Sequence, residues 1–207
     1  SLTRFSSLRD ARNLFCNILN YRMVASEVPS YAKWPANLQS LLSESPEIIA
    51  DTNGFKIVYL HLAADGLRLG AERQVIQRMY QDDPSFCGLF VVSNVNQTVW
   101  EFVSAKNKDD GSKRLLLRRV RVGNQSVRTA TERIALIQIA ESEEKTITPV
   151  KLQARHDAAF DVAAVTKQFY RELSDWYFWA LKYVRFPKNA PKEKDGYDHI
   201  SVIRLIT

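Results

Sequence analysis

The stretch FCGLFVVSNVNQTVWEFVSAK, residues 86–106, decides the fold class of this 207-residue chain. Residues 86–93 form a continuous apolar run, which is typical of a strand buried on both faces. Residues 98–106 alternate in character and predict a second strand, and the polar residues 94–97 between them predict a hairpin loop. A third strand is predicted over residues 115–122, after the polar turn at 108–112. Three successive strands of this kind predict a meander.

Helical periodicity surrounds these strands. Apolar residues recur at spacings of three and four, and Thr129 and Glu132 stand at the spacing of a capping box. The pattern predicts helices over residues 8–24, 70–80 and 129–139, and one more strand over residues 55–62. The expected architecture is therefore α/β (α+β): a mixed sheet with a strand meander flanked by helices, in a domain of residues 1–148, followed by a helical connector.

The connector is predicted over residues 156–207. Asp161 is a suitable N-cap for a long helix. Its core stripe is Val165, Phe169, Leu173, Trp176, Ala180 and Val184, and further rings follow at Tyr170, Tyr177, Phe178, Trp179 and Tyr183. A helix that is apolar on several sides needs protein neighbours. Because the last apolar pattern runs up to Thr207, we expect the chain to be the front of a longer polypeptide.

Composition narrows the classes of protein. No apolar run approaches the roughly 18 residues of a membrane helix, so no membrane partner is expected. The two cysteines, Cys16 and Cys87, are predicted to be buried thiols in a reducing compartment, which favours the cytoplasm. The three histidines lie far apart, so we predict no metal site, and we expect a structural role for His61. Walker, GxGxxG, GxSxG and HExxH motifs are all absent.

The net charge of +6 is concentrated in one segment. Residues 106–133 hold nine Lys and Arg against three Asp and Glu, so this segment carries the whole excess. On a strand, Arg119 and Arg121 share one face and Arg118 points to the other. Guanidinium groups bind phosphate oxygens in pairs. The predicted DNA contacts are Lys106, Lys113, Arg114, Arg118, Arg119, Arg121, Arg128 and Arg133. The alternative is a sheet edge that carries protective charges.

A Mg²⁺-dependent nuclease of the PD-(D/E)XK kind is a second hypothesis. Such an enzyme needs acids that hold the metal and a lysine near the attacking water. The residues available for this chemistry are Glu72, Asp83, Glu101 and Lys106. Ser104 stands two residues before Lys106, where the motif requires an acid.

Several segments taken together resemble a known family. They are LFVVSN (89–94), WEFVSAK (100–106), LRRVRVG (117–123), RTATER (128–133), FDVAAVTKQFY (160–170) and WYFWALKYVRFP (176–187). In this order they resemble the N-terminal region of type IIG-like restriction-modification proteins, which join an adenine-specific DNA methyltransferase to a restriction function. The resemblance covers residues 85–207 well and the first 80 weakly.

The resemblance implies a DNA-defence protein. Its methyltransferase core, which binds S-adenosylmethionine, would begin beyond Thr207, and Mg²⁺ would serve restriction in the full-length protein. No cofactor is expected in these 207 residues, which contain neither a methyltransferase FxGxG loop nor an Asn-Pro-Pro-Tyr tetrapeptide. The partners expected are DNA and the remainder of the polypeptide. A third hypothesis is a non-enzymatic module whose aromatic helix docks on that remainder.

Overall fold

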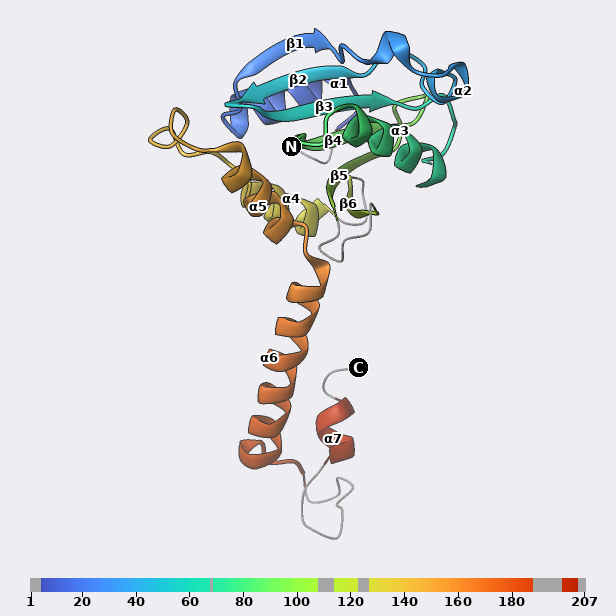
Figure 1. Cartoon of the computed structure of the whole chain (residues 1–207). Helices are drawn as coiled ribbons and strands as arrows, with labels where there is room; N and C mark the ends of the chain where they lie inside the picture. The colour runs from blue at the N-terminus through green and yellow to red at the C-terminus, as the bar shows by residue number, and fades with distance from the viewer. Residues whose placement is uncertain (1–4, 68, 108–113, 123–126, 188–198, 205–207) are drawn as a thin grey trace. The chain divides into compact units, whose positions relative to one another are not determined.

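In the part of the chain that the structure describes, six strands form one mixed sheet, in the order in which they occur along the chain (Figure 1). They are β1 (Met23–Glu27), β2 (Glu47–Thr52), β3 (Phe55–His61), β4 (Cys87–Ser93), β5 (Trp100–Asn107) and β6 (Leu115–Val122). All neighbours are antiparallel except β3 and β4, which run parallel. A parallel pair requires a crossover, and α3 (Leu69–Asp82) supplies it. The α/β fold and the meander β4–β5–β6 are confirmed.

The structure is a computed structural model that describes residues 5–67, 69–107, 114–122, 127–187 and 199–204. It divides into two units, Ser1–Phe160 and Asp161–Thr207. The second unit consists of α6 (Val162–Tyr183) and α7 (His199–Arg204), and α6 confirms the predicted long helix.

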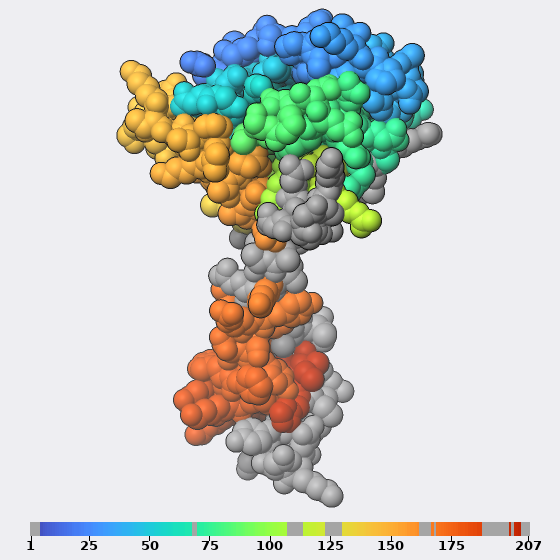
Figure 2. All heavy atoms as spheres, viewed as in Figure 1, coloured from blue at the N-terminus to red at the C-terminus, as the bar shows by residue number. Residues whose placement is uncertain are grey.

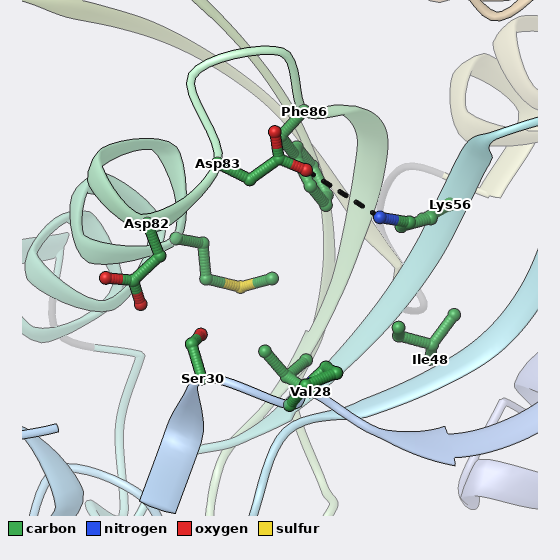
Figure 3. Close-up of a pocket in the computed structure, with 9 residues that line it drawn as sticks. Val28, Ser30, Ile48, Lys56, Asp82, Asp83 and Phe86 are labelled. Carbon is green, nitrogen blue, oxygen red and sulfur yellow. Dashed lines mark ion pairs between the residues drawn. The ribbon is translucent and has the colours of Figure 1, made fainter. Parts of the chain in front are cut away.

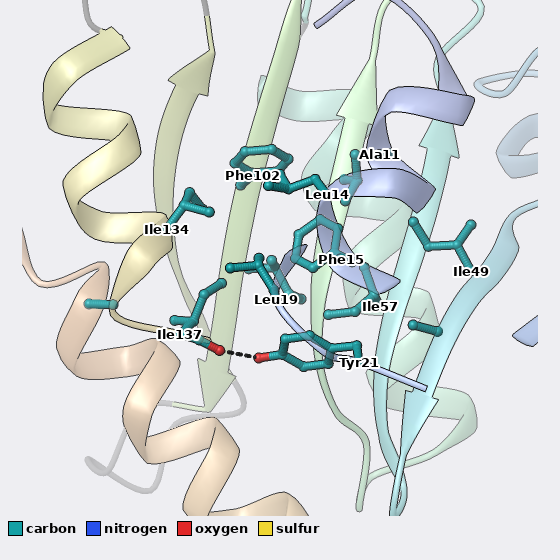
Figure 4. Close-up of a cluster of buried hydrophobic side chains, with 14 of the residues drawn as sticks. Ala11, Leu14, Phe15, Leu19, Tyr21, Ile49, Ile57, Phe102, Ile134 and Ile137 are labelled. Atoms are coloured by element: carbon teal, nitrogen blue, oxygen red, sulfur yellow. Dashed lines mark hydrogen bonds between the residues drawn. The ribbon is translucent and has the colours of Figure 1, made fainter. Parts of the chain in front are cut away.

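Helices cover both faces of the sheet. One face carries α1 (Leu8–Arg12), the π-helical turn η2 (Asn13–Ile18), α4 (Val127–Ala135) and α5 (Pro149–Ala159). Figure 4 shows side chains from this layer packed against the strands. The other face carries α3, the 3₁₀ turn η3 (Tyr31–Lys33) and α2 (Ala36–Gln39). Strand β4 sends Leu89 and Val91 into the first core and Phe90 and Val92 into the second, so it is buried on both faces as predicted.

Two strands were not predicted from the sequence. The N-terminal helical region ends at Ile18 instead of continuing to residue 24, because Asn20 adopts a positive φ of 62° and turns the chain into β1. Strand β1 lies at the sheet edge with most of its side chains exposed, so it lacks an alternating apolar pattern. Strand β2 is short and contains a register shift between Ile48 and Ala50, which interrupts its alternation.

The boundary between the two parts also differs from the prediction of 148 to 156. Helix α5 belongs to the first unit because it packs on β3 and β4 and buries Leu152, His156 and Phe160. The His156 ring is fully buried, and its Nε2 lies 2.7 Å from the Tyr21 hydroxyl. The unit therefore ends at Phe160.

Three further expectations concern single residues and the membrane. Cys16 and Cys87 are free thiols that are half-buried, not fully buried as predicted, and burial raises the pKa of both. Both ring nitrogens of His61 have polar partners, as expected for a structural histidine: Nδ1 lies 3.0 Å from Glu44 Oε1 and Nε2 lies 3.0 Å from the Val95 carbonyl oxygen.

Within the described part of the chain, no helix combines the length and apolar character needed to cross a bilayer.

Gly88 of β4 lies opposite Lys56 of β3 and leaves no room for a side chain. A Cβ atom at this position would lie 2.3 Å from the Lys56 carbonyl oxygen and 2.8 Å from the Phe86 ring. Because the first contact is with backbone, a side chain must push the parallel strands apart. We expect Gly88→Ala to lower the free energy of unfolding by about 3 kcal/mol, the upper end for overpacking. Urea unfolding measures this loss, and Gly66→Ala, where a Cβ meets nothing within 4 Å, is the matched control.

Candidate nucleic-acid interface

Strand β6 is the edge of the sheet and carries three of the predicted DNA contacts, Arg118, Arg119 and Arg121. Leu115 and Leu117 of this strand belong to the core on the α3 side, and Val120 and Val122 to the core on the opposite side. Side chains of a strand alternate between faces. Arg119 and Arg121 therefore share the α3 face, as predicted, and Arg118 lies on the other.

Arg119 pairs with a buried carboxylate. Its Nε donates to Glu72 Oε1 over 3.0 Å, and the Glu72 side chain is 0% exposed against 22% for Arg119. Helix α3 supplies Glu72 from its first turn. Burial raises the pKa of Glu72, although the Arg119 guanidinium beside it acts in the opposite direction. Glu72 Oε2 is buried and accepts no hydrogen bond from the described residues. The arrangement fastens α3 to the edge strand.

Arg121 pairs with the residue directly opposite it on β5. Its Nε and Nη2 both approach Glu101 Oε1, at 2.9 and 2.8 Å. The Glu101 side chain is only 5% exposed, whereas that of Arg121 is 62% exposed. The Arg121 side chain is thus paired with Glu101 and still largely exposed, so its guanidinium can reach an anion.

The opposite face of β5 and β6 has its own acceptor, Asp157 of α5. Arg118 Nη1 donates to the Asp157 carbonyl oxygen over 2.9 Å, and Lys106 Nζ lies 3.9 Å from the Asp157 carboxylate. Ser104 Oγ donates to the same carboxylate over 3.2 Å. Arg118 and Lys106 therefore help to hold α5 on the sheet.

The remaining predicted contacts differ in how far the structure describes them. Arg114 is exposed just before β6, and Arg133 is half-exposed on α4. Arg128 also lies on α4, but its side chain is outside the described part of the chain, as is Lys113 altogether. Of the described candidates, Arg114 and Arg121 thus have exposed side chains.

The sequence did not predict which acidic residues contact the cations of the basic segment. Glu72 is 47 residues from Arg119, and Asp157 is 39 residues from Arg118. Neither acid lies within residues 106–133, the segment that carries the net positive charge. Only Glu101 was detectable, because it stands opposite Arg121 once the β5–β6 hairpin is paired in register.

The four residues of the nuclease hypothesis do not form one site. Glu72 and Asp83 lie at opposite ends of α3, about 16 Å apart at 1.5 Å per residue. Lys106 pairs with Asp157 on the face of β5 opposite to Glu101. Metal ligands must lie within about 2.6 Å of a shared ion. Among the described residues there is also no group of three His, Cys, Asp or Glu side chains placed to hold a metal ion.

Asp83 instead lies at a pocket of about 230 Å³ on the α3 face (Figure 3). The Lys56 ammonium is 3.8 Å from the Asp83 carboxylate. Neighbouring Asp82 accepts a hydrogen bond from Trp34 Nε1 over 2.7 Å and forms an ion pair with Arg78 over 2.9 Å. Burial opposes ionisation of Asp82, but the hydrogen bonds from Ser30, Trp34 and Arg78 outweigh it and lower its pKa. Both carboxylates of the pocket therefore have cationic or N–H partners.

In comparisons with known proteins, no family model, curated protein or solved structure matches the chain significantly.

Proposed function

We propose that this chain is a non-catalytic DNA-positioning module at the front of a type IIG-like restriction-modification protein. The observation that carries the proposal is the exposure of Arg114 and Arg121 at the β6 edge of the sheet. Duplex DNA presents a regular row of phosphates, and guanidinium groups on a rigid strand bind such oxygens with defined geometry.

The arginines of the basic segment have two roles. Arg119 and Arg118 hold α3 and α5 against the strand, whereas Arg121 and Arg114 present charge to solvent. Contacts of this kind position DNA without reading its sequence. In the proposal, S-adenosylmethionine, Mg²⁺ and the chemistry they support belong to the remainder of the polypeptide, and the protein acts in the cytoplasm.

Substitutions at β6 test the proposal. Arg114→Ala and Arg121→Ala each remove one cation, so each should raise the Kd for duplex DNA about eightfold at 0.1 M salt. Each should also reduce the slope of log K against log[salt] by about 1. Glu101→Gln keeps the shape of the side chain but removes the charge that competes for Arg121, and we expect it to tighten binding. Fluorescence anisotropy over a salt series gives all three values.

The matched control is Lys33→Ala, which removes an exposed cation from η3, in the segment that follows the opposite edge strand β1. It should leave both affinity and slope unchanged. An unchanged slope in Arg114→Ala and Arg121→Ala, with native circular dichroism, would refute DNA contact through β6.

A second candidate function is protein docking through α6. Trp176 and Trp179 are 38% and 53% exposed, although tryptophan is usually buried. Exposed large apolar surfaces mark interaction sites. This function needs no DNA and is compatible with the first.

A further inference from the structure

Helix α6 has two apolar stripes, and α7 covers one of them. Ala180 of α6 and Val202 of α7 are fully buried, and the Tyr177 hydroxyl lies 2.5 Å from His199 Nδ1. Figure 2 shows α7, in red, against one side of the orange α6. The covered stripe of α6 therefore consists of Tyr177, Ala180 and their helical neighbours.

The second stripe is exposed. It contains four aromatic residues, Phe169, Trp176, Trp179 and Tyr183, and the charged Glu172. We call these five residues the aromatic seam. Phe169, Trp179 and Tyr183 are 57%, 53% and 59% exposed, and Trp176 is 38% exposed. The intervals along the seam are 3, 4, 3 and 4 residues. This is the heptad spacing of a and d positions, which brings two helices together along their length.

We infer that the aromatic seam binds the same seam of a second copy of this chain, with the two helices antiparallel. The inference deepens the docking function by naming its partner. When Trp176 lies opposite Trp179 of the second copy, the helix pitch places Glu172 opposite Tyr183 of the second copy. A two-fold axis relates the two copies and therefore repeats both pairings, as an isologous interface requires.

The charges beside the seam favour a second copy of the chain as the partner and favour the antiparallel direction. Asp175 and Lys182 are both exposed and both stand at g positions beside the seam. In the antiparallel register, Asp175 flanks Lys182 of the second copy, and the axis generates the reciprocal pair. In a parallel pair, Asp175 would instead face Ala180 of the second copy, and Glu172 would face Glu172 of the second copy. Like charges at such positions disfavour that arrangement.

Analytical ultracentrifugation of the whole chain, without DNA, tests the inference. We expect reversible dimers, and Trp176→Ala with Trp179→Ala should raise the dimer Kd more than about hundredfold, since buried tryptophans dominate interfaces. The matched control is Phe178→Ala: Phe178 is 64% exposed but lies on the side of α6 away from the seam, so its removal should leave the Kd unchanged.

A charge swap tests the direction. Asp175→Lys and Lys182→Asp each replace two attractive pairs by two repulsive ones and should raise the dimer Kd about tenfold. The double variant restores opposite charges and should recover the wild-type Kd. Lys167→Asp, the same change at an exposed cation off the seam, should have no effect. Single reversals without effect, or no recovery in the double variant, would overturn the antiparallel pairing.

Tryptophan quenching by acrylamide separates failure of this inference from failure of docking. A chain that stays monomeric at about 100 µM, far above a micromolar Kd, overturns the second copy as partner. If Trp176 and Trp179 are then quenched freely, in contrast to the buried Trp34 and Trp100, docking on a different protein still stands. If all four tryptophans are protected in the monomer, the chain itself covers the seam and both ideas fail.

Discussion

Arg119→Ala is expected to lower the free energy of unfolding by about 3 kcal/mol, because it leaves the Glu72 carboxylate buried without a counter-charge. Glu72 is 0% exposed, and its Oε2 already lacks a hydrogen-bond donor among the described residues. Urea unfolding at pH 8 measures the loss. The variant should be less impaired at pH 5, since burial already raises the pKa of Glu72 and loss of Arg119 raises it further, so that protonation relieves the buried charge.

The double variant Glu72→Met with Arg119→Met is the control. Replacing both members of a buried pair by apolar side chains is often neutral, so we expect it to recover most of the lost stability. The result also separates structure from function at β6. If Arg119→Ala left stability unchanged but weakened DNA binding as much as Arg121→Ala does, Arg119 would be a phosphate contact and not an anchor for α3.

His156 should make the first unit sensitive to acid. The Tyr21 hydroxyl has one proton, which it donates to the Ile137 carbonyl oxygen over 2.9 Å (Figure 4). It therefore accepts from His156 Nε2, and His156 Nδ1 is buried with no hydrogen-bond partner among the residues that the structure describes. Protonation would place a charge on a ring whose centroid lies 4.5 and 6.3 Å from the centroids of the Phe55 and Phe160 rings. Burial, and to a smaller extent the nearby Arg155 cation, lowers the pKa of His156 to about 3.

The direction of the pH effect follows from proton uptake. Below about pH 6.5 the unfolded chain binds a proton at this histidine, whereas the folded chain does not until about pH 3. The contribution of His156 is thus complete above pH 6.5 and falls by about 1.4 kcal/mol per pH unit as the pH drops. Between pH 7.5 and 5.0 we expect a loss of about 2 kcal/mol from this residue, measured by urea unfolding.

His156→Gln should be less stable than the wild type at pH 7.5 but should lose about 2 kcal/mol less on acidification. The matched control is Phe160→Leu, which perturbs a fully buried neighbour without removing a titrating group. It should lower stability at both pH values equally. A wild-type pH dependence in His156→Gln would show that other groups cause the acid sensitivity.

Elements whose patterns are local could be predicted from neighbouring residues alone. The apolar run of β4, the hairpin to β5 and the periodicity of α3 and α6 each follow from neighbouring residues, and the structure confirms them. Strand β1 could not be predicted in this way, because an edge strand exposes most of its side chains. Helix α5 was missed and placed outside the first unit, although its buried residues close the core.

The partners of the cations in the basic segment depend on how distant elements pack. The net charge of this segment and the faces of Arg118, Arg119 and Arg121 follow from the sequence, since strand geometry alternates side chains. The partner of each cation does not follow from the sequence, because the Glu72 carboxylate and the Asp157 carbonyl oxygen reach β6 only through the packing of α3 and α5. Ion pairs form between residues that are close in space at any separation in sequence. Folding thus assigned Arg119 and Arg118 to holding helices and left Arg121 and Arg114 toward solvent.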